Sequence, residues 1–377
     1  MKLILEPADG IAPILAAIKS AKKSVEIAIF RFDRADLEKA LIAAAARGVR
    51  VTALIAFVNR GGERSLRKLE LRFLAAGIIV ARTADDLTRY HGKYILIDRR
   101  VLYVLSFNFT RLDIDHSRGL GLVTSRLEHL TEAAKLFKAD CTRIQYAPKV
   151  DTFVVSPANS RQALGAFLKH AKKQLLIYDP KIADKEMLRI LRERAKAGVD
   201  IKVIGEALGK PPFEAKPLPG MRLHTRTIVR DRRHMFIGSQ SLRTAELDER
   251  REVGLIVQDL KAVKKVIDTF EADWTRTSST TIAPDGPDVV EAPIDDPAAA
   301  SPRAVAKAVA VFTKELEPLA AAVKKAVRKA VVKAGDDVLQ DKDVKETMKK
   351  VVKGTVKAAV KEAVRDAQGA ESPKSAA

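Results

Sequence analysis

The sequence predicts an α/β protein of two pseudo-symmetric lobes, each a mixed β-sheet flanked by helices, followed by a C-terminal helical tail. Two internal repeats and one break in composition support this prediction. One repeat relates residues 21–49 to residues 171–199 at an offset of 150, and the other relates residues 91–143 to 224–276 at an offset of 133. The composition breaks near Thr281, where prolines and acidic residues become frequent.

The first repeat has the pattern of a strand, a helix and a second strand. In the first copy these elements are expected at Val25 to Phe30, Asp36 to Arg47 and Val49 to Ala56. In the second copy they are expected at Leu175 to Tyr178, Lys185 to Ala197 and Val199 to Ile204. Because strands alternate with helices, we expect sheets with parallel crossovers.

The second repeat consists of seven identities at one offset, several of them polar. The pairs are His91 with His224, Asp98 with Asp231, Ser106 with Ser239, Gly121 with Gly254, Phe137 with Phe270, Asp140 with Asp273, and Arg143 with Arg276. Such a set indicates a duplication. The change of offset means that the second half is 17 residues shorter between its helix and its histidine.

Four segments follow from these patterns. We expect one lobe over residues 1–147, a second over 148–280, a linker rich in Pro and Asp over 281–303, and a Lys/Ala-rich amphipathic helical tail over 304–377. In the tail, apolar residues recur four apart, as at Leu319, Val323, Val327 and Val331. We expect the tail to mediate self-association or partner association; a membrane surface and nucleic acid are the alternative partners.

The net charge of the 377 residues is +20, of which residues 1–280 carry +18. A field of this size favours an anionic partner. The single cysteine, Cys141, excludes an intramolecular disulfide framework and a cysteine-based zinc site. No apolar run approaches the roughly 18–20 residues of a membrane span. We therefore expect a soluble, cytoplasmic protein that can still contact a membrane at its periphery.

The chemistry is carried by a motif that occurs twice. It is His91-Gly92-Lys93 with Asp98 in the first half and His224-Thr225-Arg226 with Asp231 in the second. Alternate residues of a strand share a face, so each imidazole is expected beside a cation, an arrangement suited to a phosphate. The same cation would repel a metal ion, and no cofactor is expected.

Polar residues follow each motif where the next strand is expected to end. They are Ser106 and Asn108 in the first half and Ser239 and Ser241 in the second. If the two halves pack about a pseudo-two-fold axis, both sets of side chains surround one cleft. An anionic phosphodiester substrate is therefore expected.

The pattern resembles the phospholipase D superfamily signature, His-x-Lys-x4-Asp-x6-Gly-Ser-x-Asn, present twice. The resemblance implies a metal-independent phosphodiesterase that proceeds through a phosphohistidine. It implies that His91 and His224 are nucleophile and general acid/base, and that Lys93 and Arg226, with Ser106, Asn108, Ser239 and Ser241, hold the phosphoryl group. It further implies that Glu252 orients His91, making His91 the nucleophile, and that Asp98 and Asp231 brace the strand turn.

Four positions depart from the family pattern. Leu105 replaces a glycine, Gly119 replaces the orienting carboxylate of the first half, Arg226 replaces lysine and Ser241 replaces asparagine. Arginine binds phosphate through a planar fork rather than a compact charge, so the geometry of the site is expected to change. The departures put the level of activity in question.

The segment Leu247 to Gly254 is similar to cardiolipin synthase-like members, and this resemblance implies a phospholipid substrate. The expected reaction is hydrolysis or transfer of a phosphatidyl group. Two alternatives stay open at this point. A nuclease or RNA phosphodiesterase of the same superfamily is favoured by the positive charge, and a catalytically weakened anion-binding module is consistent with the departures.

Overall fold

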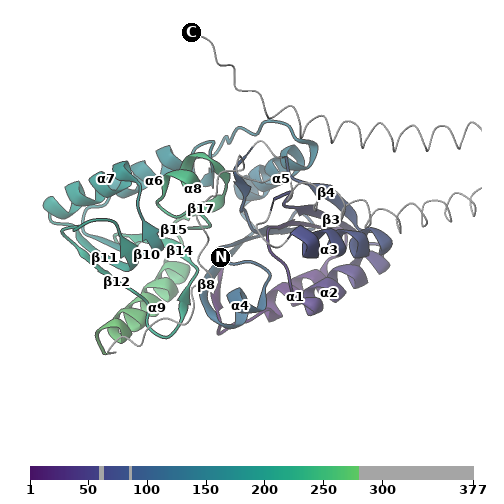
Figure 1. Cartoon of the computed structure of the whole chain (residues 1–377), viewed down its shortest axis with the longest axis horizontal. Coiled ribbons are helices and arrows are strands. Elements are labelled where there is room, and N and C mark those ends of the chain that lie inside the picture. The colour runs from purple at the N-terminus through teal and green to yellow at the C-terminus, as the bar shows by residue number, and fades with distance from the viewer. Residues whose placement is uncertain (59–62, 85–86, 280–377) are drawn as a thin grey trace, which may run out of the picture. The chain divides into compact units, whose positions relative to one another are not determined.

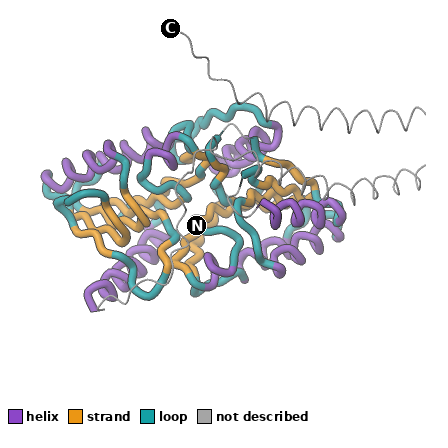
Figure 2. The backbone as a smooth tube through the Cα atoms, viewed as in Figure 1, coloured by secondary structure: helices purple, strands orange, loops and turns teal. Residues whose placement is uncertain are grey.

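The computed structural model describes residues 1–58, 63–84 and 87–279, and these residues form two large β-sheets with helices on their faces and one two-stranded sheet (Figures 1 and 2). The predicted linker, residues 281–303, and the predicted tail, residues 304–377, lie outside the described residues. Within the described part of the chain, none of the helices has both the length and the apolar content needed to cross a membrane.

The two sheets have the same strand order. The main path of the first sheet is β1 (Lys2–Glu6), β8 (Ser117–Thr124), β7 (Val101–Leu105), β6 (Tyr94–Ile97), β2 (Ser24–Ile29), β3 (Arg50–Ile55) and β4 (Ile79–Arg82). The second sheet runs β9 (Phe153–Val155), β17 (Val253–Val257), β15 (His234–Gly238), β14 (Arg226–Arg230), β10 (Gln174–Ile182), β11 (Asp200–Ala207) and β12 (Glu214–Lys216). This identity of order confirms the predicted pair of pseudo-symmetric mixed sheets.

Helices cover the sheets in layers because strand residues alternate between two apolar cores. On β2, Ile27 and Ile29 face a core shared with α1 (Ala12–Ser20), α2 (Ala35–Ala46) and α3 (Glu63–Ala75). The neighbouring Ala28 and Phe30 face a core that contains residues of both sheets, of α5 (Leu127–Thr142) and of α9 (Leu260–Ser279). A third core joins the second sheet to α6 (Ser160–Lys169) and α7 (Lys185–Lys196). The shared core joins the lobes.

The difference in length between the halves has a simple structural origin. Helix α3 connects β3 to β4 in the first lobe, whereas residues 208–213 connect β11 to β12 without a helix. Both pairs of strands are nevertheless parallel neighbours in their sheets. The second lobe therefore keeps the sheet order while it lacks the helix.

The predicted strands and helices of the first repeat are present, with ends that differ by a few residues. One expectation about the motif was wrong. Neither His91-x-Lys93 nor His224 lies within a strand, because β6 begins at Tyr94 and β14 begins at Arg226. At both places the chain leaves a contact with the opposite lobe before it enters its own sheet.

Candidate active site

Two short strands hold the histidines against the opposite lobe. In the first half, β5 (Arg89–Tyr90) pairs in parallel with β16 (Arg250–Arg251) of the second half. The backbone N–H of His91 then donates to the Arg251 carbonyl at 2.7 Å. The main chain before His91 is therefore fixed by the second lobe rather than by its own sheet.

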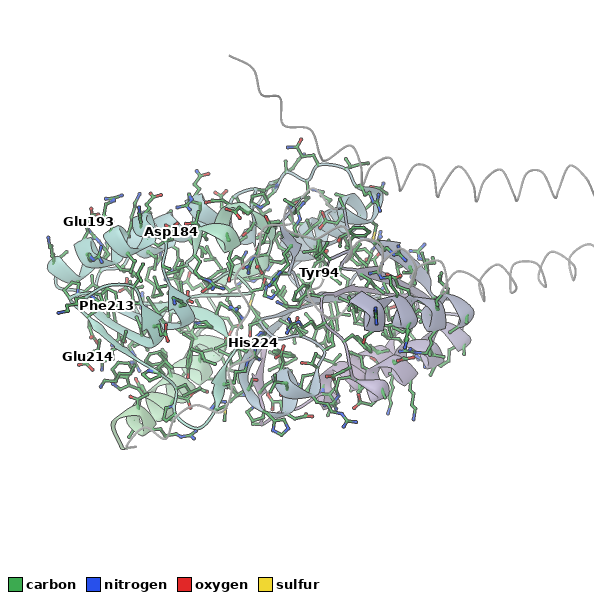
Figure 3. The ribbon with its side chains drawn as sticks, in the orientation of Figure 1. Tyr94, Asp184, Glu193, Phe213, Glu214 and His224 are labelled. Atoms are coloured by element: carbon green, nitrogen blue, oxygen red, sulfur yellow. The ribbon has the colours of Figure 1, made fainter. Side chains whose placement is uncertain are left out.

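The second half makes the same exchange in the other direction. Here β13 (Arg222–Leu223) pairs in parallel with β8 at Ser117 and Arg118. The N–H of His224 donates to the Arg118 carbonyl at 3.0 Å. In Figure 3, His224 lies where the two lobes meet. The strand exchange brings both histidines to the junction of the lobes.

Two reciprocal ion pairs stabilise this junction. Arg118 of β8 pairs with Asp273 of α9 at 2.8 Å, and Arg251 of β16 pairs with Asp140 of α5 at 3.1 Å. The offset of 133 that relates the halves also relates both arginines and both aspartates. Such exchange of equivalent contacts is the mark of a two-fold interface, here formed within one chain.

His91 is buried and is held at its side chain by a carboxylate. Its Nδ1 lies 2.9 Å from Glu252 Oε2, and the Phe30 ring packs against the imidazole in a T-shaped arrangement at a centroid distance of 4.8 Å. Burial, followed by the positive charges of Lys93 and Arg226, lowers the pKa of His91 well below its usual value. The lowered pKa favours the neutral imidazole, and Nε2 is the ring nitrogen that does not contact Glu252.

His224 is also buried, with a different carboxylate nearby. Its Nδ1 lies 3.5 Å from Asp113 Oδ2, although the contact lacks hydrogen-bond geometry. Burial lowers the pKa of His224 well below its usual value; Asp113 acts in the opposite direction, and Arg226 and Arg222 add to the lowering. His224 lies within electrostatic range of His91, whose pKa it also lowers.

One cation from each half, Lys93 or Arg226, acts electrostatically on both histidines. Lys93 is fully buried, and its Nζ has no hydrogen-bond partner among the described atoms. Burial lowers the pKa of Lys93 to about 7, against the raising effect of Glu252. Arg226 donates from one terminal nitrogen to the His224 carbonyl at 2.9 Å, while its Nε lacks a partner in the described part of the chain.

The polar residues that end the central strands are engaged with the protein to different degrees. Ser106 Oγ accepts from the Leu120 N–H at 3.0 Å, and Ser239 Oγ accepts from the Val253 N–H at 3.1 Å. Asn108 donates from Nδ2 to Asp113 at 2.7 Å, which leaves one N–H of the amide available. These three residues lie at equivalent strand ends in the two lobes.

Ser241 differs from Asn108, its counterpart in the first half. Its hydroxyl is hydrogen-bonded to Asp179, and its backbone N–H donates to Glu246 at 2.6 Å. Asp179 is completely buried, and burial raises the pKa of this carboxyl. The Ser241 hydroxyl therefore serves a contact inside the second lobe, and a role in phosphate binding stays a prediction.

The motif aspartates occupy equivalent turns. Asp98 accepts hydrogen bonds from the backbone N–H groups of Lys22, Lys23 and Ser24, and Asp231 accepts those of residues 172–174. Asp98 and Asp231 both have positive φ, at 52° and 51°. Burial is the largest single influence and raises the pKa of each carboxyl, but the three backbone donors together outweigh it, so the pKa is lowered. Each aspartate ties its turn to the strand beside it.

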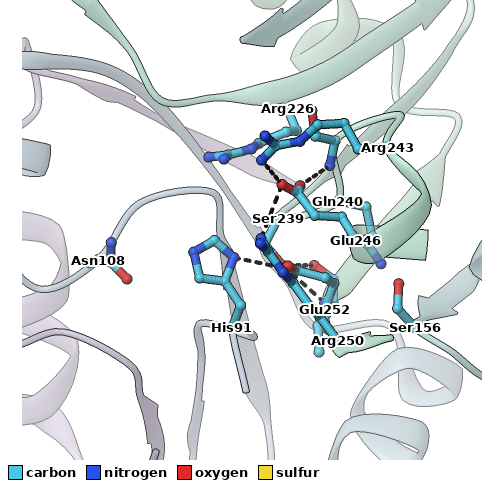
Figure 4. A network of polar contacts seen from close by, with 12 residues as sticks. His91, Asn108, Ser156, Arg226, Ser239, Gln240, Arg243, Glu246, Arg250 and Glu252 are labelled. Atoms are coloured by element: carbon cyan, nitrogen blue, oxygen red, sulfur yellow. Dashed lines mark hydrogen bonds and ion pairs between the residues drawn. The ribbon is translucent and has the colours of Figure 1, made fainter. Parts of the chain in front are cut away.

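Three acidic residues of this region were missed by the sequence reasoning: Asp113, Asp179 and Glu246. Asp113 and Glu246 are themselves related by the offset of 133. Glu246 is buried, pairs with Arg243, and lies 3.2 Å from Arg250 (Figure 4). The offset of 133 could have pointed to Asp113 and Glu246. Because it relates an aspartate to a glutamate, a search for identical residues does not find this pair.

No group of three or more His, Cys, Asp or Glu side chains is placed to hold a metal ion within residues 1–58, 63–84 and 87–279. The groups that converge are instead two imidazoles and several cations. Such a set of donors suits a phosphate oxyanion.

A family model described as "Cardiolipin synthase, PLD-like domain" matches residues 14–141 and 164–274, which together cover more than half of the chain. PLD denotes phospholipase D. The mouse (Mus musculus) mitochondrial cardiolipin hydrolase is 28% identical over 136 residues, which are 36% of this chain. The chain spans 58% of the length of that relative.

Two solved structures share the fold at low sequence identity. Polyphosphate kinase from Porphyromonas gingivalis matches 73% of this chain and 47% of its own, with a TM-score of 0.62 and 19% identity. Phosphatidylserine synthase from Haemophilus influenzae Rd KW20 matches 73% of this chain and 86% of its own, with a TM-score of 0.55 and 8% identity. At these identities the likeness shows the fold alone.

Proposed function

The chain belongs to the family of cardiolipin synthase-type phospholipase D-like domains, and from this membership we propose that it is a metal-independent phosphodiesterase that hydrolyses or transfers phosphatidyl groups. The observation that carries the proposal is the buried pair Lys93 and Arg226. An ammonium that lacks a hydrogen-bond partner among the described residues is costly to bury, so the site is built to receive an anion. Two imidazoles at the same place supply the chemistry.

In the first step, His91 Nε2 attacks phosphorus. A P–N bond forms and the P–O bond to the leaving group breaks, while His224, which enters the step as the imidazolium, transfers its Nε2 hydrogen to the departing oxygen. Lys93 and Arg226, with Ser106, Asn108 and Ser239, stabilise the charge on the phosphoryl oxygens. Glu252 at Nδ1 supports the choice of His91 as nucleophile, because the 2.9 Å contact holds the ring in place.

In the second step, His224 accepts a proton from water or an alcohol. The resulting oxygen nucleophile attacks phosphorus, a P–O bond forms, and the P–N bond to His91 breaks. Water gives hydrolysis and an alcohol gives transfer. Both histidines return to their starting protonation states, so the cycle balances without a further reactant.

A phospholipid is the favoured substrate. The matching family model and the mouse relative both carry cardiolipin in their descriptions. A lipid phosphodiester also fits the strong positive charge of residues 1–280. The cytoplasmic location, the peripheral membrane contact and the association role of the tail stay predictions.

Nucleic acid is the second candidate, favoured by the same positive charge. The experiment that separates the two incubates wild type, His91→Ala and His224→Ala with chelator, against labelled phosphatidylglycerol or cardiolipin and against plasmid and single-stranded DNA. We expect chelator-resistant turnover of lipid that either substitution abolishes. Cleavage of DNA alone would favour the nuclease. Binding of anionic lipid without turnover of any substrate would favour a binding module.

A phosphoenzyme trap tests the intermediate. Substrate labelled at phosphorus, quenched in alkaline denaturant, should leave label on wild type but not on His91→Ala. Label that persists on His91→Ala and disappears from His224→Ala would reverse the two roles.

A further inference from the structure

The carboxylate that faces His91 owes its position to the strand exchange. Glu252 directly follows Arg251, whose carbonyl accepts the His91 N–H. The equivalent position in the first half directly follows Arg118, whose carbonyl accepts the His224 N–H. That position is Gly119, so the symmetric carboxylate for His224 is missing.

Gly119 also has little room for a side chain. A Cβ atom built there would lie 2.9 Å from Phe107 Cδ1 and 3.3 Å from Glu6 Cβ. Phe107 is completely buried, and its counterpart in the second half is Gln240. The first lobe has thus filled with an aromatic ring the space from which a carboxylate would extend.

The carboxylate that lies near His224 is that of Asp113. It is the third residue of α4 (Arg111–Asp115), a short helix whose N-cap residue Thr110 accepts from the Asp113 N–H. The Asp113 side chain is 4% exposed, with Oδ2 3.5 Å from His224 Nδ1 and Oδ1 2.6 Å from Arg222. It lies six residues before Gly119 in sequence.

We propose that Asp113 is the positioning residue for His224, and that it has taken over the task of the carboxylate missing at Gly119. This inference rests on the proposed function for its catalytic meaning. Asp113 keeps the hydrogen on Nδ1, and so turns Nε2 of His224 toward the leaving oxygen. The same carboxylate anchors the Asn108 amide, which couples the general acid to a phosphate ligand.

The repeat counterpart of Asp113 shows why the task is not shared symmetrically. Glu246 is occupied by Arg243 and Arg250, and Arg226 is the strongest charge acting on it. It therefore balances the arginines of the second half, while Glu252 serves His91. The charged groups that act on His224 are Asp113 on α4, Arg226 on β14, Arg222 on β13, and Lys93.

The direct test is the tautomer of His224, measured by nitrogen NMR on protein labelled at its six histidines. His224→Ala identifies the signal. At a pH where the ring is neutral, wild type should carry the hydrogen on Nδ1. Asp113→Asn should shift the balance toward Nε2–H, and Asp113→Glu should restore Nδ1–H. Asp115→Asn, which removes an equal charge from the same helix at an exposed position, should change nothing.

A wild-type ring with its hydrogen on Nε2, or the same tautomer in Asp113→Asn, would overturn the inference, and the wild-type readout does not depend on the folding of an Asp113 variant. The second readout is the pH profile of kcat. Because Asp113 raises the pKa of His224, its loss should move the alkaline limb to lower pH and reduce kcat about tenfold. If Asp113 sets the tautomer of His224 but the protein turns over no phosphodiester, the inference stands and the proposed function is rejected.

Discussion

The two half-sites share a backbone but differ in how each histidine is supported. In the first half, His91 receives a close contact from Glu252, at 2.9 Å, across the lobe junction. In the second half, His224 faces Asp113 at 3.5 Å, and that carboxylate is already engaged by Asn108 and Arg222. A tightly held, neutral imidazole suits a nucleophile, and a looser one that exchanges a proton suits a general acid. The duplication has thus supplied two equal positions, and local substitutions have made them unequal.

The departures from the family pattern belong to the same differentiation. Leu105 is paired with Gly121 across β7 and β8, and a Cβ at Gly121 would lie 2.7 Å from Leu105 Cδ2. The Leu105 side chain therefore packs over a glycine, which leaves the core undisturbed. The positive charge of Arg226 is offset by the carboxylate of Glu246, whose pKa it lowers. Each unusual residue is matched by a neighbour.

The largest expected difference between the half-sites lies in their dependence on the leaving group. Either His91→Ala or His224→Ala should lower kcat on a phospholipid by about 10⁴-fold or more. A p-nitrophenyl phosphodiester has a leaving group that needs no proton. With this substrate, the first turnover of His224→Ala should approach the wild-type rate, whereas that of His91→Ala should not. Release of nitrophenol in single turnover measures this, with the exposed His170→Ala as control. Equal losses on both substrates would contradict the assigned roles.

The cation pair is expected to have the next largest effect. Lys93→Met should reduce kcat/KM about 10²–10³-fold, because a donor to the charged oxygens is lost. Lys93 is charged below its pKa of about 7 and Glu252 is neutral below its pKa of about 8, so tungstate, a phosphate analogue, should bind more weakly as pH rises from 7 to 9. Lys93→Arg should keep only the part of this decline that comes from Glu252. Titration calorimetry measures the affinity for tungstate at each pH. An affinity that rises between pH 7 and pH 9 would refute the electrostatic argument.

The carboxylates should differ in importance according to their contacts. Glu252→Gln is expected to lower kcat about 10²-fold, because the His91 ring loses the carboxyl group that holds its Nδ1. The smaller, roughly tenfold loss for Asp113→Asn follows from its longer contact. Steady-state kinetics on the two variants gives the ratio of the two losses in kcat. A greater loss at Asp113 than at Glu252 would show that the general acid depends more strongly on its support.

The smallest effects are expected where the halves are equivalent. Asp98→Ala and Asp231→Ala each remove the acceptor of three backbone N–H groups and should lower the free energy of unfolding by about 2 kcal/mol. Because the folded-state pKa values are lowered, this stability is present above the unfolded pKa and disappears as pH falls through the folded pKa. Urea unfolding at pH 7 measures the loss. The control is Asp268→Ala, which removes an exposed aspartate that pairs with Lys264. Its free energy of unfolding should stay within about 0.5 kcal/mol of the wild-type value.

The fold could be predicted from sequence because duplication left its record in local patterns. The strand–helix–strand units, the turn at Asp98 and the strand Val101–Leu105 all follow from local periodicity and turn chemistry. The strand placement of His91 and His224 did not, because the exchange of β5 and β13 between lobes depends on segments far apart in the chain. A strand of two residues has no periodicity to detect.

By itself, the sequence determined the duplicated α/β architecture, the two histidines with their cations, and the family to which the motifs belong. These features are local in the chain and repeat at fixed offsets, so they need no knowledge of packing. The tertiary structure decided which carboxylate faces which histidine, because Asp113 and Glu252 reach their partners across the lobe junction over long separations in sequence. It also decided that Lys93 is buried without a hydrogen-bond partner in the described part of the chain, since burial is a property of the packed lobes and not of the residue.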